Sequence, residues 1–446
     1  MSLRILSAAN VEQLIARQMI PLSELVAETG RVFHRLSHDP LSISNPDRSS
    51  VSMHAHGTLL SMPAYVSGIG ASVKLVAVPK YPNESQTISP LDGNYGNQQT
   101  ARRVRIGSSG LAATTIVLDP SSGVPKCIIN ARQLTALRTA AGSLLATQLL
   151  LTTSSAPKTL VLFGAGLQIE YHAEFILSAF PSIHSCYLLT RSAPTAATTN
   201  PNSVPRASRV CARLREAHPA KRISIVSRVN EDGDEEEDDG TSVAKPDLSN
   251  RHKPLFPRSW REACSVADIL VFATPSTTPL VRSSWIRAGA HLVLVGSYTP
   301  DMHEVPTSLI NRASRVVVDS RDHSMREAGE LIAAELNPQS DLVELGELVD
   351  PSGNPVLGPI HSARTGEITI FKSVGLAIQV SLWNFFQKKV FFFYILLICV
   401  TDNDFLHLAG RDDWSNAPGT CRSLSHRDRH PRLRLTLFLT FRTFGV

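Results

Sequence analysis

The segment that decides the fold reads Thr159-Leu160-Val161-Leu162-Phe163-Gly164-Ala165-Gly166-Leu167-Gln168. Its first half is a short apolar run that predicts a buried strand. A helix is expected from Gln168, and its apolar face consists of Ile169, Ala173, Ile176 and Phe180. Gly164 permits a tight turn, and Gly166 lets the backbone approach a pyrophosphate at the helix N-terminus. The third fingerprint position is Ile169 instead of Gly or Ala, so helix and strand must pack differently. A tight turn without a ligand is the alternative interpretation.

The chain on the C-terminal side of this turn alternates between apolar strands and helices. Strands this uniformly apolar favour a parallel sheet covered by helices on both faces. We therefore predict an α/β fold with a Rossmann-like parallel sheet. Its expected strands are residues 159–163, 185–190, 223–226, 269–274, 291–296 and 315–319, with a helix over 168–180.

The N-terminal part has a different pattern. Residues 1 to about 30 are expected to be helical, with Ser7 and Ser23 as N-caps. Extended segments follow to about residue 130, and β-branched residues around the turn 121–123 predict a hairpin. Leu and Ala recur at three- and four-residue spacing over 133–151, which predicts a helix.

Composition sets limits on the partners and the compartment. A chain of 446 residues with 43% hydrophobic residues is long enough for two domains, since domains usually have about 100–200 residues. The net charge of +5 is small for this length, and much of the excess Arg lies in the last third of the chain, so no basic face for nucleic acid is expected. The six cysteines form no CxxC pair and have no nearby His ligands, which fits a reducing compartment and predicts no metal site. The N-terminal residues 1–6 lack the apolar core of a signal peptide, so a cytoplasmic location is expected. The apolar run 390–400 is shorter than the roughly 20 residues of a spanning helix, so no membrane anchor is expected.

Two stretches do not fit the alternating pattern. An insertion of about residues 193–260 contains the acidic block 231–239, which is expected to be a solvated loop because like charges cannot pack. Residues 380–446 change to an aromatic run and then to Arg- and His-rich sequence. We expect this tail to be aberrant or disordered. It begins with Val380-Ser381, which an intron-opening hexanucleotide would encode in frame, so translated intron is our hypothesis for it.

The end of the second strand bears on the choice of cofactor. NAD-binding proteins usually place an Asp or Glu there, on the ribose 2′-hydroxyl. This strand ends Leu189-Thr190-Arg191-Ser192, without an acid. The guanidinium of Arg191 is well shaped to pair with a 2′-phosphate, so NADPH is expected rather than NADH. An ordinary exposed arginine at a strand end is the alternative.

Five strings occur together in the chain: Met62-Pro63-Ala64-Tyr65 with Lys74, Leu134-Thr135-Ala136-Leu137-Arg138-Thr139-Ala140-Ala141, Gly164-Ala165-Gly166-Leu167-Gln168, Ala267-Asp268-Ile269 and Glu367-Ile368-Thr369-Ile370-Phe371-Lys372-Ser373-Val374-Gly375. Together they resemble the ornithine cyclodeaminase/mu-crystallin family, and the mu-crystallin/ketimine reductase type more than the true cyclodeaminases. The resemblance covers about residues 1–379. It implies a homodimer whose substrate-binding and dimerisation domain combines residues 1–150 with a return segment 331–379, around a Rossmann-like domain of residues 151–330.

The resemblance places Arg48, Lys74 and Arg138 at the substrate, with Lys74 and Arg138 as catalytic residues. Such cations suit a substrate that carries a carboxylate, because guanidinium groups bind carboxylates bidentately. Each has a simpler interpretation: Arg48 as an exposed turn residue, Lys74 as the solvent-facing residue of a strand, and Arg138 as a solvated helix residue. The residues expected to bind the cofactor are Gly164, Ala165, Gly166, Leu167, Gln168, Arg191, Thr274 and Ser373.

One departure from the family bears on the reaction. Cyclodeaminases of the family use an Asp where this chain has Tyr298, and a phenol with a pKa near 10 is a poor base. We therefore do not expect ornithine cyclisation. The expected activity is NADPH-dependent reduction of a cyclic ketimine carboxylate, with alanine dehydrogenase-like chemistry as a close variant. The alternative is a cofactor-dependent small-ligand binding protein without turnover.

Overall fold

The computed structural model describes residues 3–16, 21–68, 70–79, 112–151, 156–191, 205–228, 257–356 and 366–378. By its internal contacts the chain divides into two compact units, residues 1–392 and 393–446. All described residues belong to the first unit. The acidic block 231–239, the apolar run 390–400 and the tail 380–446 lie outside the described residues. No helix within the described ranges is long and apolar enough to cross a membrane.

The N-terminal sheet is mixed, and its strand order is β1-β7-β6-β5-β4-β2, with β3 paired to β4. β4 to β7 pair antiparallel, whereas β1 pairs parallel with β7. The predicted hairpin is therefore confirmed as β6 and β7. The bounds are β1 (Arg4–Leu6), β2 (Ile43–Ser44), β3 (Ser49–Ser52), β4 (Gly57–Val66), β5 (Gly70–Pro79), β6 (Ala112–Leu118) and β7 (Pro125–Asn130).

The helices of this part begin close to the positions that the sequence signals predict. Ser7 precedes α1 (Ala8–Ala16), and its Oγ accepts from the backbone N–H of Asn10 at 3.2 Å. α2 (Leu22–His38) starts after Pro21 rather than at a Ser23 cap. The expectation of helix from residue 1 was wrong for β1, because its backbone groups find partners in the strand β7. The 3-10 helices η1 (Pro40–Ser42) and η2 (His54–His56) follow.

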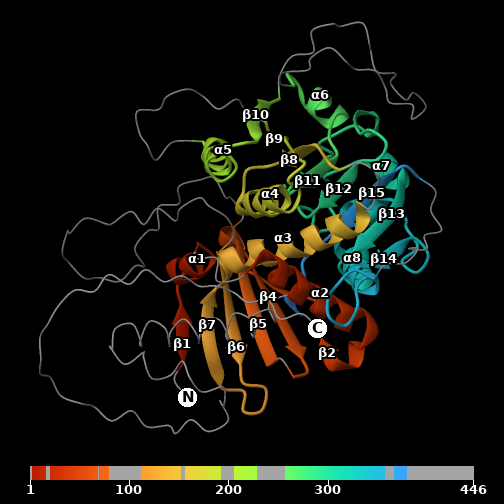
Figure 1. The fold of residues 1–446 in the computed structure, drawn as a ribbon. Helices are drawn as coiled ribbons and strands as arrows, with labels where there is room; N and C mark the ends of the chain where they lie inside the picture. Colours follow the sequence, from red (N-terminus) through yellow and green to blue (C-terminus); the bar gives the residue numbers. More distant parts are fainter. Residues whose placement is uncertain are drawn as a thin grey trace, which may run out of the picture. The chain divides into compact units, whose positions relative to one another are not determined.

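Helix α3 (Ala131–Leu150) connects the N-terminal sheet to the second sheet. It packs against β6 on one side and α4 on the other, so its residues are buried on nearly every face. Figure 1 shows α3 between the two sheets. Its N-cap is Asn130, whose Oδ1 accepts from the N–H of Arg132 at 3.3 Å. This position explains the apolar, Ala-rich composition, since small residues let two layers approach the helix.

The second sheet is parallel in every pairing that the described residues make, with the order β10-β9-β8-β11-β12-β15-β13-β14. The predicted α/β fold is confirmed. β14 and β15 were not among the predicted strands, and β15 lies between β12 and β13. The bounds are β8 (Thr159–Phe163), β9 (Ser185–Thr190), β10 (Arg222–Ser227), β11 (Ile269–Phe272), β12 (His291–Leu294), β13 (Ala313–Val318), β14 (Leu342–Glu344) and β15 (Ile368–Lys372).

Helices connect these strands. The predicted insertion of about 193–260 is not continuous, because α5 and β10 within it belong to the sheet and its cover. The bounds are α4 (Leu167–Ala179), α5 (Arg206–Ala217), α6 (Trp260–Ser265), α7 (Thr307–Asn311), α8 (Arg321–Glu327), α9 (Gly329–Ala333), η4 (Ser283–Trp285) and η5 (Leu345–Leu348).

The chain after β14 contacts both parts of the protein. η5 packs against α2, where the Oγ of Ser37 donates to Glu344 Oε2 at 2.7 Å. A Cβ at Gly346 would lie 2.0 Å from the carbonyl oxygen of Phe33, so only glycine fits this contact. β15 then returns to the parallel sheet. The segment 331–379 thus contributes to the parallel sheet as well as to the contact with α2, and the domain boundaries themselves stay a prediction.

Candidate functional site

The carboxyl ends of the parallel strands form one edge of the second sheet. β8 lies between β9 and β11. The chain first extends the sheet on one side of β8, through β9 and β10, and then on the other side, through β11 and β12. Such a switch point leaves a crevice at the carboxyl ends of the strands, where ligands bind in open α/β sheets. The residues that follow β9, β8, β11, β12 and β15 therefore succeed one another along this edge (Figure 1).

The glycine turn after β8 has the geometry that a dinucleotide needs. Gly164 has φ +114°, and a Cβ there would lie 3.3 Å from the carbonyl oxygen of Ala273. Gly166 is the N-cap of α4, and a Cβ there would meet nothing within 4 Å. The Oε1 of Gln168 is buried and has no hydrogen-bond partner among the described residues. The open space and the helix N-terminus fit a bound pyrophosphate.

The other predicted cofactor residues divide between two places. The Cγ2 of Thr274 lies 3.5 Å from the Cβ position of Gly164, so Thr274 lines the same turn. Arg191 is exposed directly after β9, whose Leu189 carbonyl accepts from the N–H of Gly164 at 3.5 Å. The hydroxyl of Ser373, by contrast, donates to Asp319 Oδ2 at 2.8 Å, at the end of β15.

The three predicted substrate residues come together from separate elements. Lys74 on β5 is 3% exposed and Arg138 on α3 is 4% exposed, so neither is a solvated face residue. Arg48 and Arg138 both lower the pKa of Lys74, in addition to the larger effect of burial, which places the three cations within electrostatic reach. Beside Lys74 in register lies Thr115, whose Oγ1 is buried without a partner among the described residues.

Asp319 is a buried carboxylate that the sequence reasoning missed. It follows β13, and its Oδ2 accepts from the Oγ of Ser373 and the N–H of Gly375, both at 2.8 Å. A Cβ at Gly375 would lie 2.9 Å from the guanidinium of Arg138, so the backbone there touches that side chain. Burial lowers the pKa of Arg138 to about 10, although Asp319 opposes the shift. The buried guanidinium therefore has a counter-charge close by.

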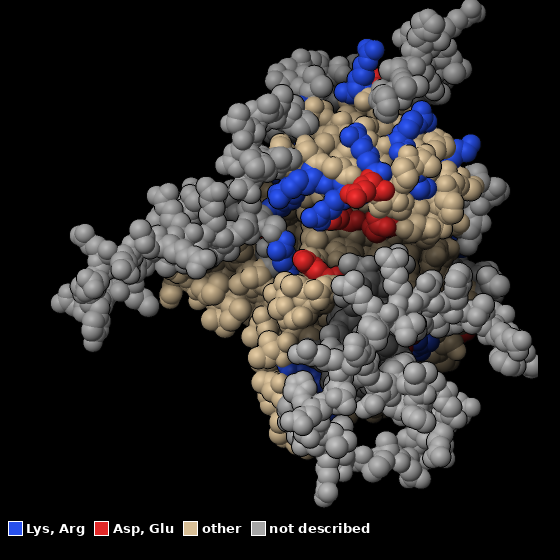
Figure 2. Space-filling model, turned by 60° about the vertical axis from the view of Figure 1, so that its left-hand side comes forward, with Lys and Arg blue, Asp and Glu red and all other residues tan. Residues whose placement is uncertain are grey.

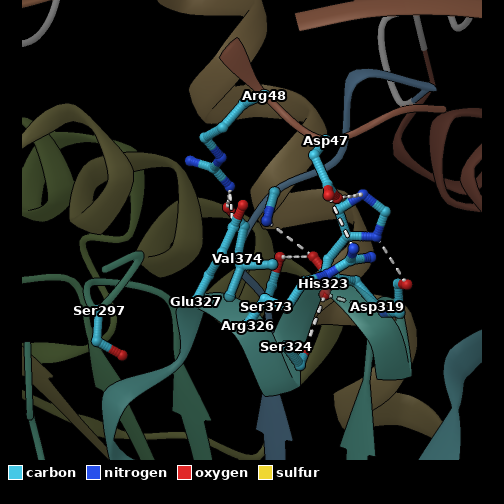
Figure 3. Close-up of polar contacts among 12 residues, drawn as sticks. Asp47, Arg48, Ser297, Asp319, His323, Ser324, Arg326, Glu327, Ser373 and Val374 are labelled. Atoms are coloured by element: carbon cyan, nitrogen blue, oxygen red, sulfur yellow. Dashed lines mark hydrogen bonds and ion pairs between the residues drawn. The ribbon is translucent and has the colours of Figure 1, made fainter. Parts of the chain in front are cut away.

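Glu327 at the end of α8 is the second missed carboxylate. It forms an ion pair with the guanidinium of Arg48, which also donates to the carbonyl oxygen of Val374 at 3.1 Å (Figure 3). Arg48 is therefore not a free turn residue, and its side chain is 16% exposed. Burial raises the pKa of Glu327 to about 7, against the opposing effect of Arg48. The neighbouring Asp47 pairs with Arg326 at 2.7 Å.

Tyr298 lies after β12, on the same edge. Burial raises the pKa of its phenol above the ordinary value, and Arg48 acts in the opposite direction. The residue is half-buried and protonated at neutral pH. It is within electrostatic reach of the substrate cluster, and its raised pKa leaves even less phenolate available as a base at neutral pH than in a free tyrosine.

A basic face formed by α5 was not evident from the sequence. Figure 2 turns forward the side where α4 and α5 lie, and Lys and Arg side chains gather there around a smaller acidic group. Two ion pairs tie α5 and the turn after it to α4: Arg213 with Glu170 at 2.5 Å, and His218 with Glu174 at 3.1 Å. The exposed arginines of this helix are Arg206, Arg209, Arg213 and Arg215.

A glycine turn at the switch point of a parallel sheet, next to a buried cluster of cations and carboxylates, is the arrangement of a dinucleotide-binding α/β protein with a site for an anionic small molecule. The profile of the ornithine cyclodeaminase/mu-crystallin family matches residues 9–232 and 257–386. The chain belongs to this family, and the resemblance stated from the motifs is confirmed.

Relatives of known name are similar over most of the chain. Ketimine reductase mu-crystallin of Mus musculus is 26% identical over 76% of this chain and 82% of its own. A Delta(1)-pyrroline-2-carboxylate/Delta(1)-piperideine-2-carboxylate reductase of Azospirillum brasilense is 30% identical, over 75% and 81%. Thermococcus litoralis Delta(1)-pyrroline-2-carboxylate reductase, solved with NADH and L-proline, has a TM-score of 0.60 at 22% identity, over 85% and 94%. This structural likeness supports the fold.

Proposed function

We propose that this protein is an NAD(P)H-dependent oxidoreductase that reduces the C=N bond of a cyclic ketimine carboxylate. The observation that carries the proposal is the convergence of Arg48, Lys74 and Arg138 at the sheet edge that also carries the glycine turn. The names of the relatives in Mus musculus and Azospirillum brasilense agree with this reaction.

The side chains have separable tasks in this proposal. Arg48 and Arg138 bind the substrate carboxylate, because guanidinium groups pair with carboxylates through charge-assisted hydrogen bonds. The bound dinucleotide supplies the hydride that adds to the imine carbon. Lys74 holds the proton that the imine nitrogen must gain. Because burial and two neighbouring cations lower its pKa well below the ordinary value, Lys74 can release a proton far more readily than an exposed lysine.

The preference for NADPH over NADH is part of the proposal. Arg191 follows β9, and Arg228 lies beside it because its N–H donates to the carbonyl oxygen of Thr190 at 2.9 Å. α5 connects the adjacent parallel strands β9 and β10, so its first residue, Arg206, lies at the carboxyl edge as well. Arg191 and Arg206 would flank a ribose 2′-phosphate, whereas the guanidinium of Arg228 lies over the ring of Trp260, 5.4 Å from its centroid. None of residues 189–191 is acidic.

The test is the initial rate of nicotinamide absorbance loss with a cyclic ketimine carboxylate and either NADPH or NADH. We expect faster oxidation of NADPH, and loss of turnover in Arg138→Ala. Arg222→Ala is the matched control, because Arg222 is exposed at the amino end of β10, on the opposite edge. Binding of NADPH, with neither its oxidation by any imine offered nor reduction of NADP+ by any amino acid offered, would instead identify a small-ligand binding protein.

A homodimer is the expected assembly, and the N-terminal sheet offers a surface for it. The face opposite Lys74 is apolar and half-buried, with Val73, Leu75, Ile116 and Ile128 on adjacent strands. An apolar outer face of this kind favours cover by another protein surface, here a second copy. Leu75→Glu should give a monomer in sedimentation experiments. Val51→Glu, at an exposed position on β3, should leave the dimer intact.

A further inference from the structure

A buried network of charged groups lies beneath the ends of β11, β12 and β15. Glu304, Glu330 and Lys372 are each fully buried. Lys372 pairs with Glu330 Oε1 at 3.1 Å and donates to the carbonyl oxygen of Ser297 at 2.7 Å. With both glutamates ionised, the group carries one net negative charge. Buried charge is costly, so a role for the arrangement is to be expected.

The carboxylate of Glu304 bridges two strand ends. Its Oε1 accepts from the N–H of Thr274 at 2.7 Å and from the Thr274 hydroxyl at 2.9 Å. Its Oε2 accepts from the N–H of Gly296 at 2.7 Å. Thr274 follows β11 and Gly296 follows β12, so one side chain fixes the spacing of both turns. A Cβ at Gly296 would lie 2.2 Å from the Thr274 carbonyl oxygen, so the three groups leave no spare room.

These two turns border the glycine turn of the dinucleotide site. Thr274 lies against Gly164, and Gly296 leads to Ser297 and Tyr298 towards the substrate cluster. Along the edge, the ends of β11 and β12 therefore lie between the expected pyrophosphate and the three cations. A nicotinamide ring that meets the substrate must pass over these two turns.

We propose that Glu304 is a positioning residue, which holds Thr274 and Gly296 at the separation that the nicotinamide end of the dinucleotide requires. This inference rests on the proposed function, because it assumes that NAD(P)H binds at this edge. The contacts favour the ionised form, since all three hydrogen bonds are donated to Glu304. A protonated carboxyl would direct its own O–H at one of these donors and lose that bond.

The charge on Glu304 depends on pH in the neutral range. Burial raises the pKa of Glu304 to about 7, Lys372 lowers it, and Glu330 raises it further. The charged groups that face Glu304 thus come from β15 and α9, and His303 precedes it in its own loop. If only the ionised form holds the turns correctly, about one tenth of the protein is competent at pH 6 and most of it at pH 8, so affinity should fall roughly tenfold.

The experiment is titration of the intact protein with NADH at pH 6 and pH 8, followed by nicotinamide fluorescence. NADH is the probe because it lacks the 2′-phosphate, whose own ionisation near about pH 6 would interfere. We expect the wild-type Kd to be roughly tenfold higher at pH 6. Glu304→Gln should bind weakly at both pH values with no pH dependence. Glu327→Gln removes a second described carboxyl whose pKa burial raises to about 7, and it should keep the wild-type pH dependence.

The outcomes separate the inference from the function on which it rests. Glu304→Gln with wild-type affinity and pH dependence would overturn the positioning role alone. A wild-type protein that binds neither NADH nor NADPH would overturn the proposed function, and the positioning role with it. Should Glu304→Gln fail to fold by circular dichroism, Glu304→Asp replaces it. Its carboxylate stays charged but is one methylene too short to bridge both turns, so weak NADH binding at pH 8 is expected, and wild-type affinity would contradict the role.

Discussion

Arg48 and Glu327 form an ion pair although they are 279 residues apart in the chain. Arg48 comes from the segment between β2 and β3 of the N-terminal sheet, and Glu327 ends α8 beside the parallel sheet. Their side chains are 16% and 14% exposed. In the proposed reaction Arg48 binds the substrate carboxylate, so Glu327 pairs with the same guanidinium group that the substrate must bind. The carboxylate of Glu327 thus competes with the substrate and repels it.

Replacing Glu327 with Gln should tighten substrate binding at alkaline pH. At pH 8 the glutamate is ionised, since its pKa is about 7, and Gln removes a repulsion on the order of 1 kcal/mol. We expect the KM for the ketimine carboxylate to fall roughly fivefold at pH 8 and to change little at pH 6. Steady-state kinetics at both pH values measure this. A large fall in kcat with KM unchanged would show that Glu327 takes part in the proton transfer instead.

The two glycines of the turn should respond differently to alanine. Gly166→Ala places a methyl group in open space at an ordinary φ of −83°, so the unfolding free energy should stay within about 1 kcal/mol of wild type. The same methyl group fills the pyrophosphate position, and dinucleotide Kd should rise about tenfold or more. Gly164→Ala, at φ +114°, should cost about 1–3 kcal/mol of stability. Urea unfolding and NADPH titration measure the two variants. Equal changes in stability and in dinucleotide Kd at both positions would contradict the prediction.

Arg191→Ala should weaken NADPH binding specifically. Loss of a charge-assisted contact to the 2′-phosphate is worth about 1.5–3 kcal/mol, which is roughly a ten- to hundredfold rise in Kd. NADH has no 2′-phosphate, so its Kd should hardly change. Fluorescence titration with both dinucleotides gives the ratio, and equal losses for the two would mean that Arg191 does not read the phosphate. Arg215→Ala, an exposed position near the end of α5, is the control.

His291 should make the fold sensitive to acid. Burial lowers its pKa to about 3, and the ring contacts Thr147 at 3.2 Å and Thr369 at 2.9 Å. A depressed histidine pKa means that the unfolded chain binds more protons below about pH 6.5, so stability falls as pH falls. His291→Gln should be less stable at pH 7 by about 1–3 kcal/mol. Between pH 6 and pH 4, the unfolding free energy of the variant should fall less steeply than that of the wild type, by about 1 kcal/mol per pH unit.

Urea unfolding at several pH values gives the slope of the unfolding free energy against pH for the variant and for the wild type. The contributions of other titrating groups cancel when the two slopes are compared. His184→Gln is the matched control, because His184 is exposed. Its slope should equal that of the wild type. A His291→Gln slope equal to the wild-type slope would show that His291 is not the acid-sensitive group.

Local patterns carried the prediction of the parallel sheet. The run 159–163 was predicted as a strand and is β8 with the same bounds, and residues 185–190 are likewise β9. These strands are central and covered on both faces, so hydrophobicity alone marks them. β15 was not predicted as a strand, and its five residues include the polar Thr369 and the charged Lys372. Its neighbours β12 and β13 precede it in the chain, and no local pattern shows that a later segment is inserted between two earlier strands.

The site divides in the same way. The glycine turn is local, so the order of its residues is enough to indicate a dinucleotide site. Lys74 has apolar neighbours in the sequence and its burial could not be read from them, because the covering helix α3 and the cations Arg48 and Arg138 arrive from elsewhere in the chain. Asp319 and Glu327 were missed for the same reason, since each belongs to the site through its interaction with an arginine that is far away in the sequence.

The sequence by itself determined the class of fold, the position of the glycine turn and the family, because these depend on short-range periodicity and on strings of neighbouring residues. Only the tertiary structure decided which charges meet. It paired Arg48 with Glu327, set Asp319 beside Arg138, and enclosed Glu304 between the turns at Thr274 and Gly296. The physical reason is that electrostatic energy depends on distance and burial in space, and neither is encoded in the separation of two residues along the chain.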